Sequence, residues 1–326
     1  MVGSALPASE VRGEKPAPRL LRRSRWLEST AELLVKVVSL VSILSVLLIL
    51  VFVGKEALPV LTSAEVHKEL TPGALLVPGA AGFMWQPVSD VPKYNIVPLF
   101  VGTLKVTLVA LFLAVPLSVG AAVYVCEFAP KKWREYIKPA IELLAGIPSV
   151  VIGFFALIVM ATWVQRIFGT EHRLNVLVAG AGLTFAVCPV IFSVAEDALR
   201  AVPDSFRTAA LALGSTRSQT LLRVILPAAM PGIAAAVVLG FGRAIGETMI
   251  VVLASGNAAI LDASLGHSTR TVTATIAQEL GEVVVGSAHY HVLFMLGALL
   301  FLCTLAVNLM GERIVFGMRR KLGGGS

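Results

Sequence analysis

Long apolar runs with few charged residues dominate this sequence of 326 residues and leave few options for its fold. Hydrophobic residues make up 56% of the chain and charged residues only 14%, whereas soluble domains contain about 25% charged residues. A helix of about 20 apolar residues crosses the hydrocarbon core of a bilayer. Six such runs occur, at residues 37–53, 96–125, 141–164, 174–195, 228–254 and 289–310. The sequence therefore predicts an all-α, polytopic membrane protein with six transmembrane helices.

The basic residues between these runs indicate the orientation. Of the 27 lysines and arginines, 19 fall on one side of the predicted spans, 6 on the other side and 2 within spans. Lysine and arginine accumulate in cytoplasmic loops, so both termini are expected in the cytoplasm and the protein in the cell (inner or plasma) membrane. The formal charge of +7 is explained by this asymmetry and does not imply a nucleic-acid partner.

The predicted organisation has four parts. Residues 1–36 form a basic cytoplasmic segment, and residues 37–95 hold the first span and a long extracytoplasmic loop. Residues 96–322 form the core of five spans, with a polar cytoplasmic loop at 200–226. The glycine-rich residues 323–326 are interpreted as an appended linker. The three cysteines are isolated and show no metal or redox spacing, so neither a metal site nor a cofactor is predicted.

Two ionisable residues interrupt the fifth run. Arg243 and Glu247 are the only charged residues between Val224 and Ser255 and are expected at bilayer depth. Four residues apart on one helix, their side chains share a face and can pair. Ionisable residues at this depth usually face a polar pathway. Two interpretations remain open: Arg243 and Glu247 line a substrate path, or they form a structural ion pair that fixes helix contacts.

Residues near this pair, and one in the second run, complete the predicted path. Gly242 and Gly246 form a stripe that would let a neighbouring helix approach closely. Thr248 follows Glu247 and offers a hydroxyl donor to the path. Lys105 lies about two turns inside the second run, where it either lines the path or extends its ammonium to the outer surface.

The loop at 200–226 has helical periodicity although it is polar. Phe206, Ala209, Ala210 and Leu213 recur at helical spacing and form one apolar stripe. Gly214 is placed to end this helix, and a second helix is expected from near Ser215 to Pro227. The stripe suits either the groove of a partner protein or the surface of the protein's own spans.

This loop resembles the cytoplasmic signature of ABC importer permeases, which reads Glu-Ala-Ala, three residues, Gly, nine residues, then Ile-x-Leu-Pro. Thr208-Ala209-Ala210, Gly214 and Val224-Ile225-Leu226-Pro227 match this spacing without a gap. Thr208 replaces the usual Glu and Val224 the usual Ile. The threonine removes an acid from the expected ATPase interface. The resemblance implies a type I (MetI-like) permease fold with a cytoplasmic coupling helix, in which Phe206, Thr208, Ala209, Ala210, Leu213, Gly214 and Pro227 couple to an ATPase.

The resemblance is narrower in three other stretches. Residues 242–249 (GRAIGETM), residues 146–149 and the ending from His289-Tyr290 to Asn308 are similar to the C-like permease of Pst-type phosphate importers. This similarity implies inorganic phosphate as substrate, a homologous second permease, a cytoplasmic ATPase dimer and an extracytoplasmic phosphate-binding protein as partners. The chain has no G-x-x-x-x-G-K-[ST] loop, so it is predicted to be a non-catalytic subunit whose partner hydrolyses ATP.

The resulting hypothesis is that Arg243 gives phosphate a transient counter-charge while Glu247 holds the arginine when the path is empty. Three other interpretations remain. The cargo could be another oxyanion such as sulfate or molybdate, since their permeases share the coupling loop. A stand-alone secondary carrier would need internal repeats with paired broken helices, and none is evident. A membrane scaffold or sensor would use Arg243 and Glu247 only to lock helices together.

Overall fold

The computed structural model describes residues 25–79 and 82–323. The chain separates into two compact units, Met1–Val51 and Phe52–Ser326. The described part of the first unit is helical and belongs to α1 (Arg25–Ala57), which carries the first apolar run. The predicted basic segment before residue 25, and residues 324–326 of the predicted linker, lie outside the described residues.

The second unit is helical apart from one small hairpin and its loops. Its first part contains α2 (Pro59–Thr62), α3 (Val66–Glu69), η1 (Pro72–Leu75), β1 (Trp85–Gln86), β2 (Lys93–Tyr94), α4 (Val97–Val123), η2 (Tyr124–Phe128) and α5 (Lys131–Ala145). Its middle contains α6 (Ser149–Phe155), η3 (Ala156–Met160), α7 (Ala161–Phe168) and α8 (Val176–Arg200). Its last part contains α9 (Asp204–Ala212), α10 (Arg217–Thr220), η4 (Leu221–Ile225), α11 (Leu226–Ile245), α12 (Met249–Ala254), α13 (Val272–Glu279) and α14 (Ala288–Gly323).

Six helical stretches of the described chain are long and apolar enough to cross a membrane, which confirms the predicted count. They are Ser29–Thr62, Val97–Phe128, Ser149–Phe168, Val176–Arg200, Arg217–Ile245 and Ala288–Met318. Three of them contain or adjoin one-turn π-helical segments (η2, η3 and η4) where an apolar helix changes its hydrogen-bond register.

Helix breaks divide two of the predicted spans. The third was predicted from residue 141, but residues 131–145 form a separate helix, α5, and the span begins at Ser149. Pro148 lies between the two helices with an extended backbone. It has no peptide N–H to donate, so the preceding helix does not continue through it. The fifth span was predicted as one helix to residue 254, but it ends at Ile245 and a short helix follows.

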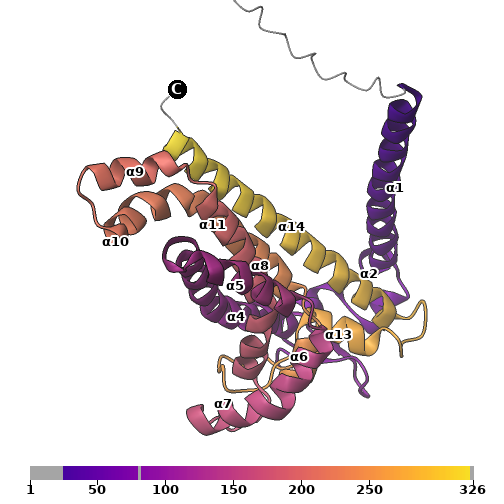
Figure 1. Ribbon diagram of the computed structural model, residues 1–326. Coiled ribbons are helices and arrows are strands. Elements are labelled where there is room, and N and C mark those ends of the chain that lie inside the picture. Colours follow the sequence, from indigo (N-terminus) through magenta and orange to yellow (C-terminus); the bar gives the residue numbers. More distant parts are fainter. Residues whose placement is uncertain (1–24, 80–81, 324–326) are drawn as a thin grey trace, which may run out of the picture. The chain divides into compact units, whose positions relative to one another are not determined.

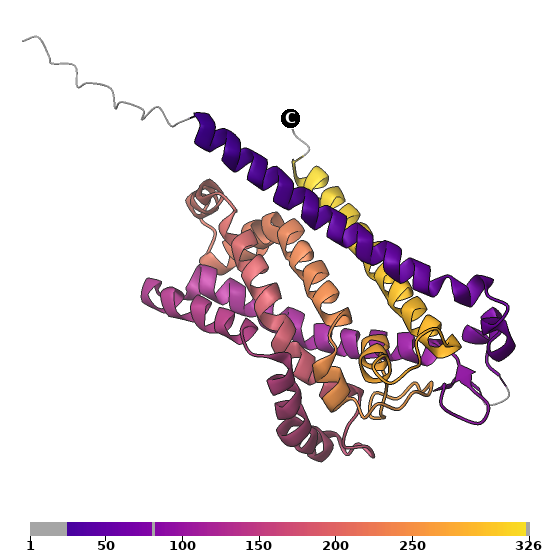
Figure 2. The ribbon, with the colours of Figure 1, turned by 90° about the vertical axis from the view of Figure 1, so that its right-hand side faces the viewer.

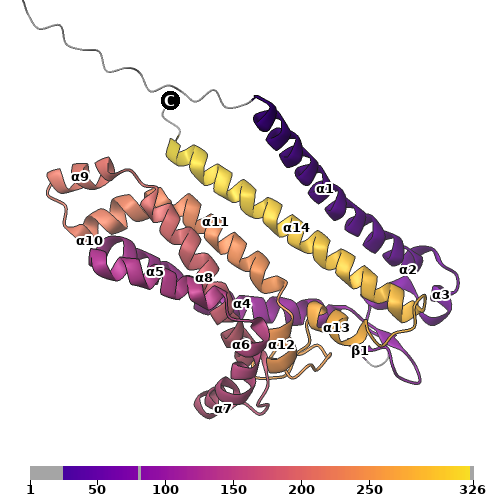
Figure 3. The same ribbon diagram turned by 45° about the vertical axis from the view of Figure 1, so that its right-hand side comes forward.

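The main core lies where α4, α8 and α11 pack together, and α14 runs beside α11 (Figures 2 and 3). Glycines permit this close packing, as two contacts illustrate. A Cβ at Gly180 on α8 would lie 2.5 Å from the side chain of Val109 on α4. A Cβ at Gly240 on α11 would lie 2.5 Å from the side chain of Ile191 on α8. Small residues at helix contacts therefore set how α8 lies between its neighbours.

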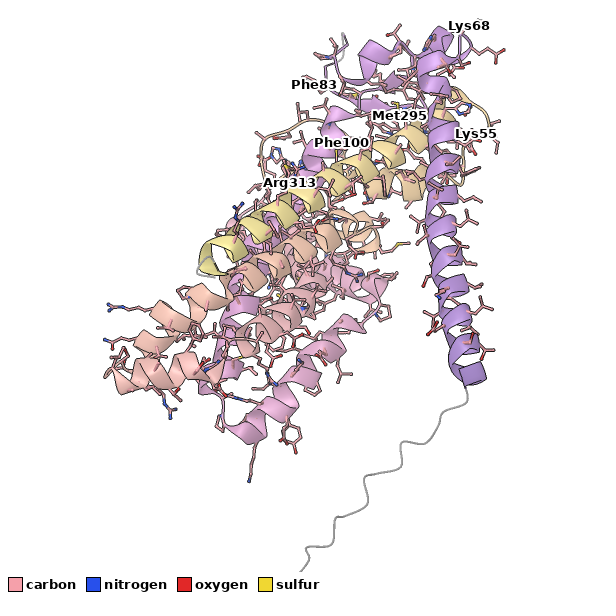
Figure 4. The ribbon with its side chains drawn as sticks, turned by 90° about the horizontal axis from the view of Figure 1, so that it is seen from above. Lys55, Lys68, Phe83, Phe100, Met295 and Arg313 are labelled. Atoms are coloured by element: carbon pink, nitrogen blue, oxygen red, sulfur yellow. The ribbon has the colours of Figure 1, made fainter. Side chains whose placement is uncertain are left out.

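A second apolar cluster joins the loop before α4 to α13 and the start of α14. It includes Met295 on α14, and the partly buried Phe100 on α4 packs against the cluster (both residues are labelled in Figure 4). The fully buried Trp85 anchors the hairpin by donating from its indole nitrogen to Glu279, 3.0 Å away. Burial raises the pKa of Tyr94 to about 12, with the charges of Glu69 and Glu279 adding to the effect. The long loop predicted at 55–95 is thus folded against the helices.

Candidate functional site

The fifth span is broken at Gly246–Thr248, between α11 and α12. Gly246 caps α11, and the peptide N–H of Glu247 still reaches the Ala244 carbonyl at 3.3 Å, so the break is compact. The Glu247 carboxylate then accepts the N–H groups of Thr248 (3.1 Å) and Met249 (3.2 Å), the first donors of α12. The hydroxyl of Thr273 donates to the Glu247 carbonyl at 2.8 Å. These contacts satisfy backbone groups that the break frees, as a broken helix in a membrane requires.

Arg243 occupies the last turn of α11, where a cation interacts favourably with the helix C-terminus. Its side chain is exposed and makes no hydrogen bond or ion pair with any residue that the structure describes. One turn of α11 faces α14, because a Cβ on Gly242 would lie 3.6 Å from the side-chain oxygen of Asn308. The exposed Asn308 thus places a second polar group beside the turn that carries Arg243.

This arrangement corrects the predicted pairing of Arg243 with Glu247. The prediction assumed one continuous helix, but Glu247 lies beyond the end of α11 and its carboxylate caps α12 instead. The predicted glycine stripe is also interrupted. Gly246 lies outside the helix, and a Cβ there would meet only the carbonyl of Gly242 at 3.7 Å. The tight contacts of α11 with α8 are made through Gly232 and Gly240 instead, where a Cβ would lie 2.4 Å from the side chain of Ala198 and 2.5 Å from that of Ile191.

The remaining predicted path residues have mainly structural contacts. Thr248 donates its peptide N–H to Glu247, and its hydroxyl lies 3.5 Å from the Gly246 carbonyl. The ammonium of Lys105 donates to the carbonyls of Asp262 and Ser264, each at 2.8 Å. Lys105 therefore anchors the loop that follows α12. A path role for Lys105 or Thr248 stays a prediction.

The coupling segment, residues 200–226, forms a helical hairpin at one end of the second unit (Figure 1). The predicted first helix is confirmed as α9, and Gly214 follows its end with φ of +83°, a conformation that favours glycine. Thr216 starts the second helix with a capping box, in which its side chain and that of Gln219 each accept the other's backbone N–H. From Arg217 the chain is helical without interruption to Ile245, through η4 and α11.

The apolar stripe of α9 is mostly open. Phe206 is 48% exposed, Leu213 is 88% exposed, and Ala209 is also exposed, whereas Ala210 is buried against the protein's own helices. Thr208 donates its hydroxyl to the carbonyls of Asp204 and Ser205 within the same helix. Most of the stripe is therefore free for a partner, and Thr208 offers no acid in place of the usual Glu.

A network of ion pairs, which the sequence reasoning missed, ties α9 to the spans. Arg207 on α9 lies 2.7 Å from Glu127 at the end of η2 and 2.9 Å from Asp204. These contacts raise the pKa of Arg207, chiefly through the hydrogen bond with Glu127. Arg207 also donates to the carbonyls of Leu199 and Val202 at 3.4 and 3.3 Å. A single guanidinium thus connects α9 with the ends of two membrane-spanning helices.

A second part of the network centres on Glu196, whose side chain is fully buried near the end of α8. Lys138 on α5 lies 2.7 Å from one of its carboxylate oxygens and 3.1 Å from Asp197, and Arg200 pairs with the other oxygen of Glu196. The hydrogen bond with Glu196 raises the pKa of Lys138. The acidic pair that ends the fourth run was the available sequence signal, but nothing in the sequence identified its partners.

We expect Lys138→Met to destabilise the protein by about 3 kcal/mol, because it removes one of the two cations that pair with the buried carboxylate of Glu196. The contribution of Lys138 is expected to be complete below its ordinary pKa of 10.5 and to be lost only as the pH rises through the raised value. Thermal unfolding of the protein in nanodiscs measures both effects. Lys132→Met, at an exposed position of the same helix, is the control, and equal midpoints for the two variants would contradict the assignment.

Comparisons with known proteins agree with this architecture. Residues 114–320 match the family described as binding-protein-dependent transport system inner membrane component. The chain is 36% identical over 235 residues to the probable ABC transporter permease protein YqgH of Bacillus subtilis, covering 70% of this chain and 75% of that protein. It is 33% identical over 258 residues to the phosphate transport system permease protein PstC of Xylella fastidiosa, covering 73% and 78%.

A solved structure shows the same fold. The structure of the MetNI methionine ABC transporter in inward-facing conformations matches with a TM-score of 0.52 and 22% identity, covering 67% of this chain and 93% of that chain. The predicted MetI-like architecture is thereby confirmed at the level of the fold. From the extent of the family match and the identity to its relatives, the chain belongs to the binding-protein-dependent transport system inner membrane components, as an ABC transporter permease of the Pst type.

Proposed function

We propose that this chain is the permease subunit of an ATP-driven importer of inorganic phosphate and forms one half of the translocation path. The observation that carries the proposal is Arg243, an exposed guanidinium in a membrane-spanning helix without a counter-charge among the described residues. Such a residue is costly in a membrane unless it serves a pathway. Its paired donors match the oxygens of a tetrahedral oxyanion. The similarity to permeases named for phosphate transport supports phosphate as that anion.

Glu247 has a different role from the one predicted. One of its carboxylate oxygens holds the two N–H groups of α12, and the other accepts no hydrogen bond from any residue in the described part of the chain. At neutral pH phosphate keeps at least one P–OH group, which donates to a carboxylate, whereas sulfate has no proton to donate. A carboxylate accepts such a bond but repels a fully deprotonated anion. We assign to Glu247 the discrimination between phosphate and sulfate.

The coupling segment transmits movements of the ATPase subunits to this path. In the proposed complex, two cytoplasmic ATPase subunits bind the coupling helices of this chain and of a homologous second permease, and an extracytoplasmic phosphate-binding protein delivers the substrate. A push on α9 acts on Gly214 and then on the helix that starts at Arg217. Because the chain is helical from Arg217 to Ile245, this displacement reaches the turn of Arg243 along one element.

Uptake by the reconstituted complex tests the cargo. Proteoliposomes that hold this chain, the second permease and the ATPase are supplied with labelled phosphate, the binding protein and internal ATP. We expect ATP-dependent uptake whose rate changes by no more than about 2-fold in a hundredfold excess of sulfate or molybdate. A site built to bond a hydroxyl strongly disfavours an analogue without one. Uptake of labelled sulfate at the same rate would show that the cargo is another oxyanion, and uptake without ATP would show a secondary carrier.

A further inference from the structure

Two loops far apart in the sequence are joined at the N-terminus of α8. One loop, residues 169–175, connects α7 to α8, and the other, residues 255–271, connects α12 to α13. The first peptide N–H groups of α8, on Val176 and Leu177, donate to the carbonyls of His267 and Leu265 at 3.2 and 3.3 Å. The hydroxyl of Ser268 donates to the Leu174 carbonyl at 2.8 Å. Backbone contacts therefore hold the two loops together independently of any ligand.

Three metal-ligating side chains meet where these loops join. Ligand atoms of Glu171, His172 and His267 all lie within 4.8 Å of one another. The His267 Nε2 and the Glu171 Oε2 atoms are 3.7 Å apart. Two ligands bound to one tetrahedral zinc ion at about 2.1 Å are separated by about 3.4 Å. The rings of His172 and His267 have centroids 5.2 Å apart at an angle of 70°. A rotation of these side chains would bring their ligand atoms to coordination distance from one cation.

A fourth residue orients the central ligand. Asp262 accepts a hydrogen bond from the Nδ1 atom of His267, which leaves Nε2 of that ring free to bind a cation. Asp262 is itself held by the peptide N–H of Ser264 at 2.7 Å. The ammonium of Lys105 fixes the same loop through the carbonyls of Asp262 and Ser264. A carboxylate behind a ligating histidine is the usual outer support of zinc sites, and here it comes from the same loop as the histidine.

We propose that Glu171, His172 and His267 bind a zinc-class divalent cation that links the loop before α8 to the loop before α13. Two imidazoles and one carboxylate favour zinc over magnesium or calcium, which prefer all-oxygen shells. Three protein ligands leave a fourth position for water or a partner's side chain. Both loops lie on the side predicted to be extracytoplasmic, where such a cation would stiffen the outer surface. This site is independent of which anion the protein carries.

Zinc titration of the untagged full-length protein in nanodiscs by isothermal calorimetry tests the proposal. We expect one ion per chain with micromolar or tighter affinity, no competition from millimolar magnesium or calcium, and an unfolding midpoint that rises with zinc. His172→Ala and Glu171→Gln are expected to weaken binding at least about 10-fold each, and Asp262→Asn about 10- to 100-fold. Glu171 and His172 are exposed, so their replacement leaves the fold intact.

His67→Ala is the matched control, because His67 lies in α3, outside both loops, where its ring contacts the Val60 carbonyl. We expect zinc to bind this variant as tightly as the unaltered protein and to raise its unfolding midpoint equally. The proposal is overturned if the unaltered protein shows no zinc binding at micromolar concentration. It is equally overturned if His172→Ala and Glu171→Gln retain full affinity, or if His67→Ala loses as much affinity as they do.

Discussion

Phosphate uptake is expected to fall at least about 100-fold in the Arg243→Gln variant, while the transporter still assembles. Hydrogen bonds to a charged group contribute about 1.5–3 kcal/mol each, and a guanidinium offers a pair of them to one oxyanion. Because Arg243 contacts no described residue through a hydrogen bond or ion pair, its replacement breaks no such contact within the chain. Uptake by proteoliposomes and co-purification of the partner subunits measure the two effects separately.

Two further variants separate charge from geometry at this position. Arg243→Lys keeps the charge but loses the planar fork, so it should recover part of the uptake. Arg166→Gln removes an exposed arginine in the last turn of α7, outside the coupling segment, and should leave uptake within about 2-fold. In the Glu247→Gln variant we expect sulfate to compete with phosphate. Normal uptake in Arg243→Gln would rule out the proposed path, whereas unchanged selectivity in Glu247→Gln would rule out only the role of that carboxylate.

Binding of the ATPase is expected to weaken at least about 10-fold when Ala209 on α9 becomes Trp, and transport should be lost with it. Ala209 is exposed, so the larger side chain enters the space of a partner and leaves the core of this chain unchanged. Overpacking of a well-fitted contact costs about 1–3 kcal/mol, which accounts for this loss of affinity. Co-purification of the ATPase, and ATP hydrolysis stimulated by the binding protein, are the measurements.

Leu211→Trp is the matched control for this variant. Leu211 is 48% exposed on the same helix, but two residues from Ala209 and therefore on a different face. Gly214→Val provides an independent test, because a β-branched residue strains the backbone at φ of +83° without meeting any neighbour within 4 Å. It should change the angle between α9 and the following helix and reduce transport more than ATPase binding. If Ala209→Trp and Gly214→Val both transport normally, α9 does not couple the two subunits.

The approximate positions of the six spans and of the coupling helix follow from local sequence patterns. Long apolar runs must form helices in a membrane, because every backbone group has to be satisfied within the segment. Gly214 could be placed because a helix end with positive φ favours glycine at that position. The start of the third span at Ser149 was harder to predict from the sequence. Residues 141–145 are apolar enough to belong either to that span or to the helix before it.

The predicted contact between Arg243 and Glu247 was wrong, and the path role of these residues stays a prediction. Sequence spacing could place Arg243 and Glu247 on one helix face only if the helix continued. At the break, the hydroxyl of Thr273, which lies in α13, donates to the carbonyl of Glu247. No local pattern at residues 240–249 contains that information. The contact between Arg207 and Glu127 could not be predicted for the same reason, because these residues are 80 positions apart in the chain.

The sequence by itself determined that this protein crosses the membrane, which predicted span carries an arginine at bilayer depth, and where an apolar stripe lies in the polar loop. These properties depend on hydrophobicity, charge and helical period, all of which act between near neighbours. The tertiary structure alone decided that Glu247 caps α12, that α9 is tied to η2, and that His172 and His267 meet at α8. The contact of α9 with η2 and the meeting of His172 with His267 join residues that are about 80 to 95 positions apart, a separation at which local sequence patterns carry no information.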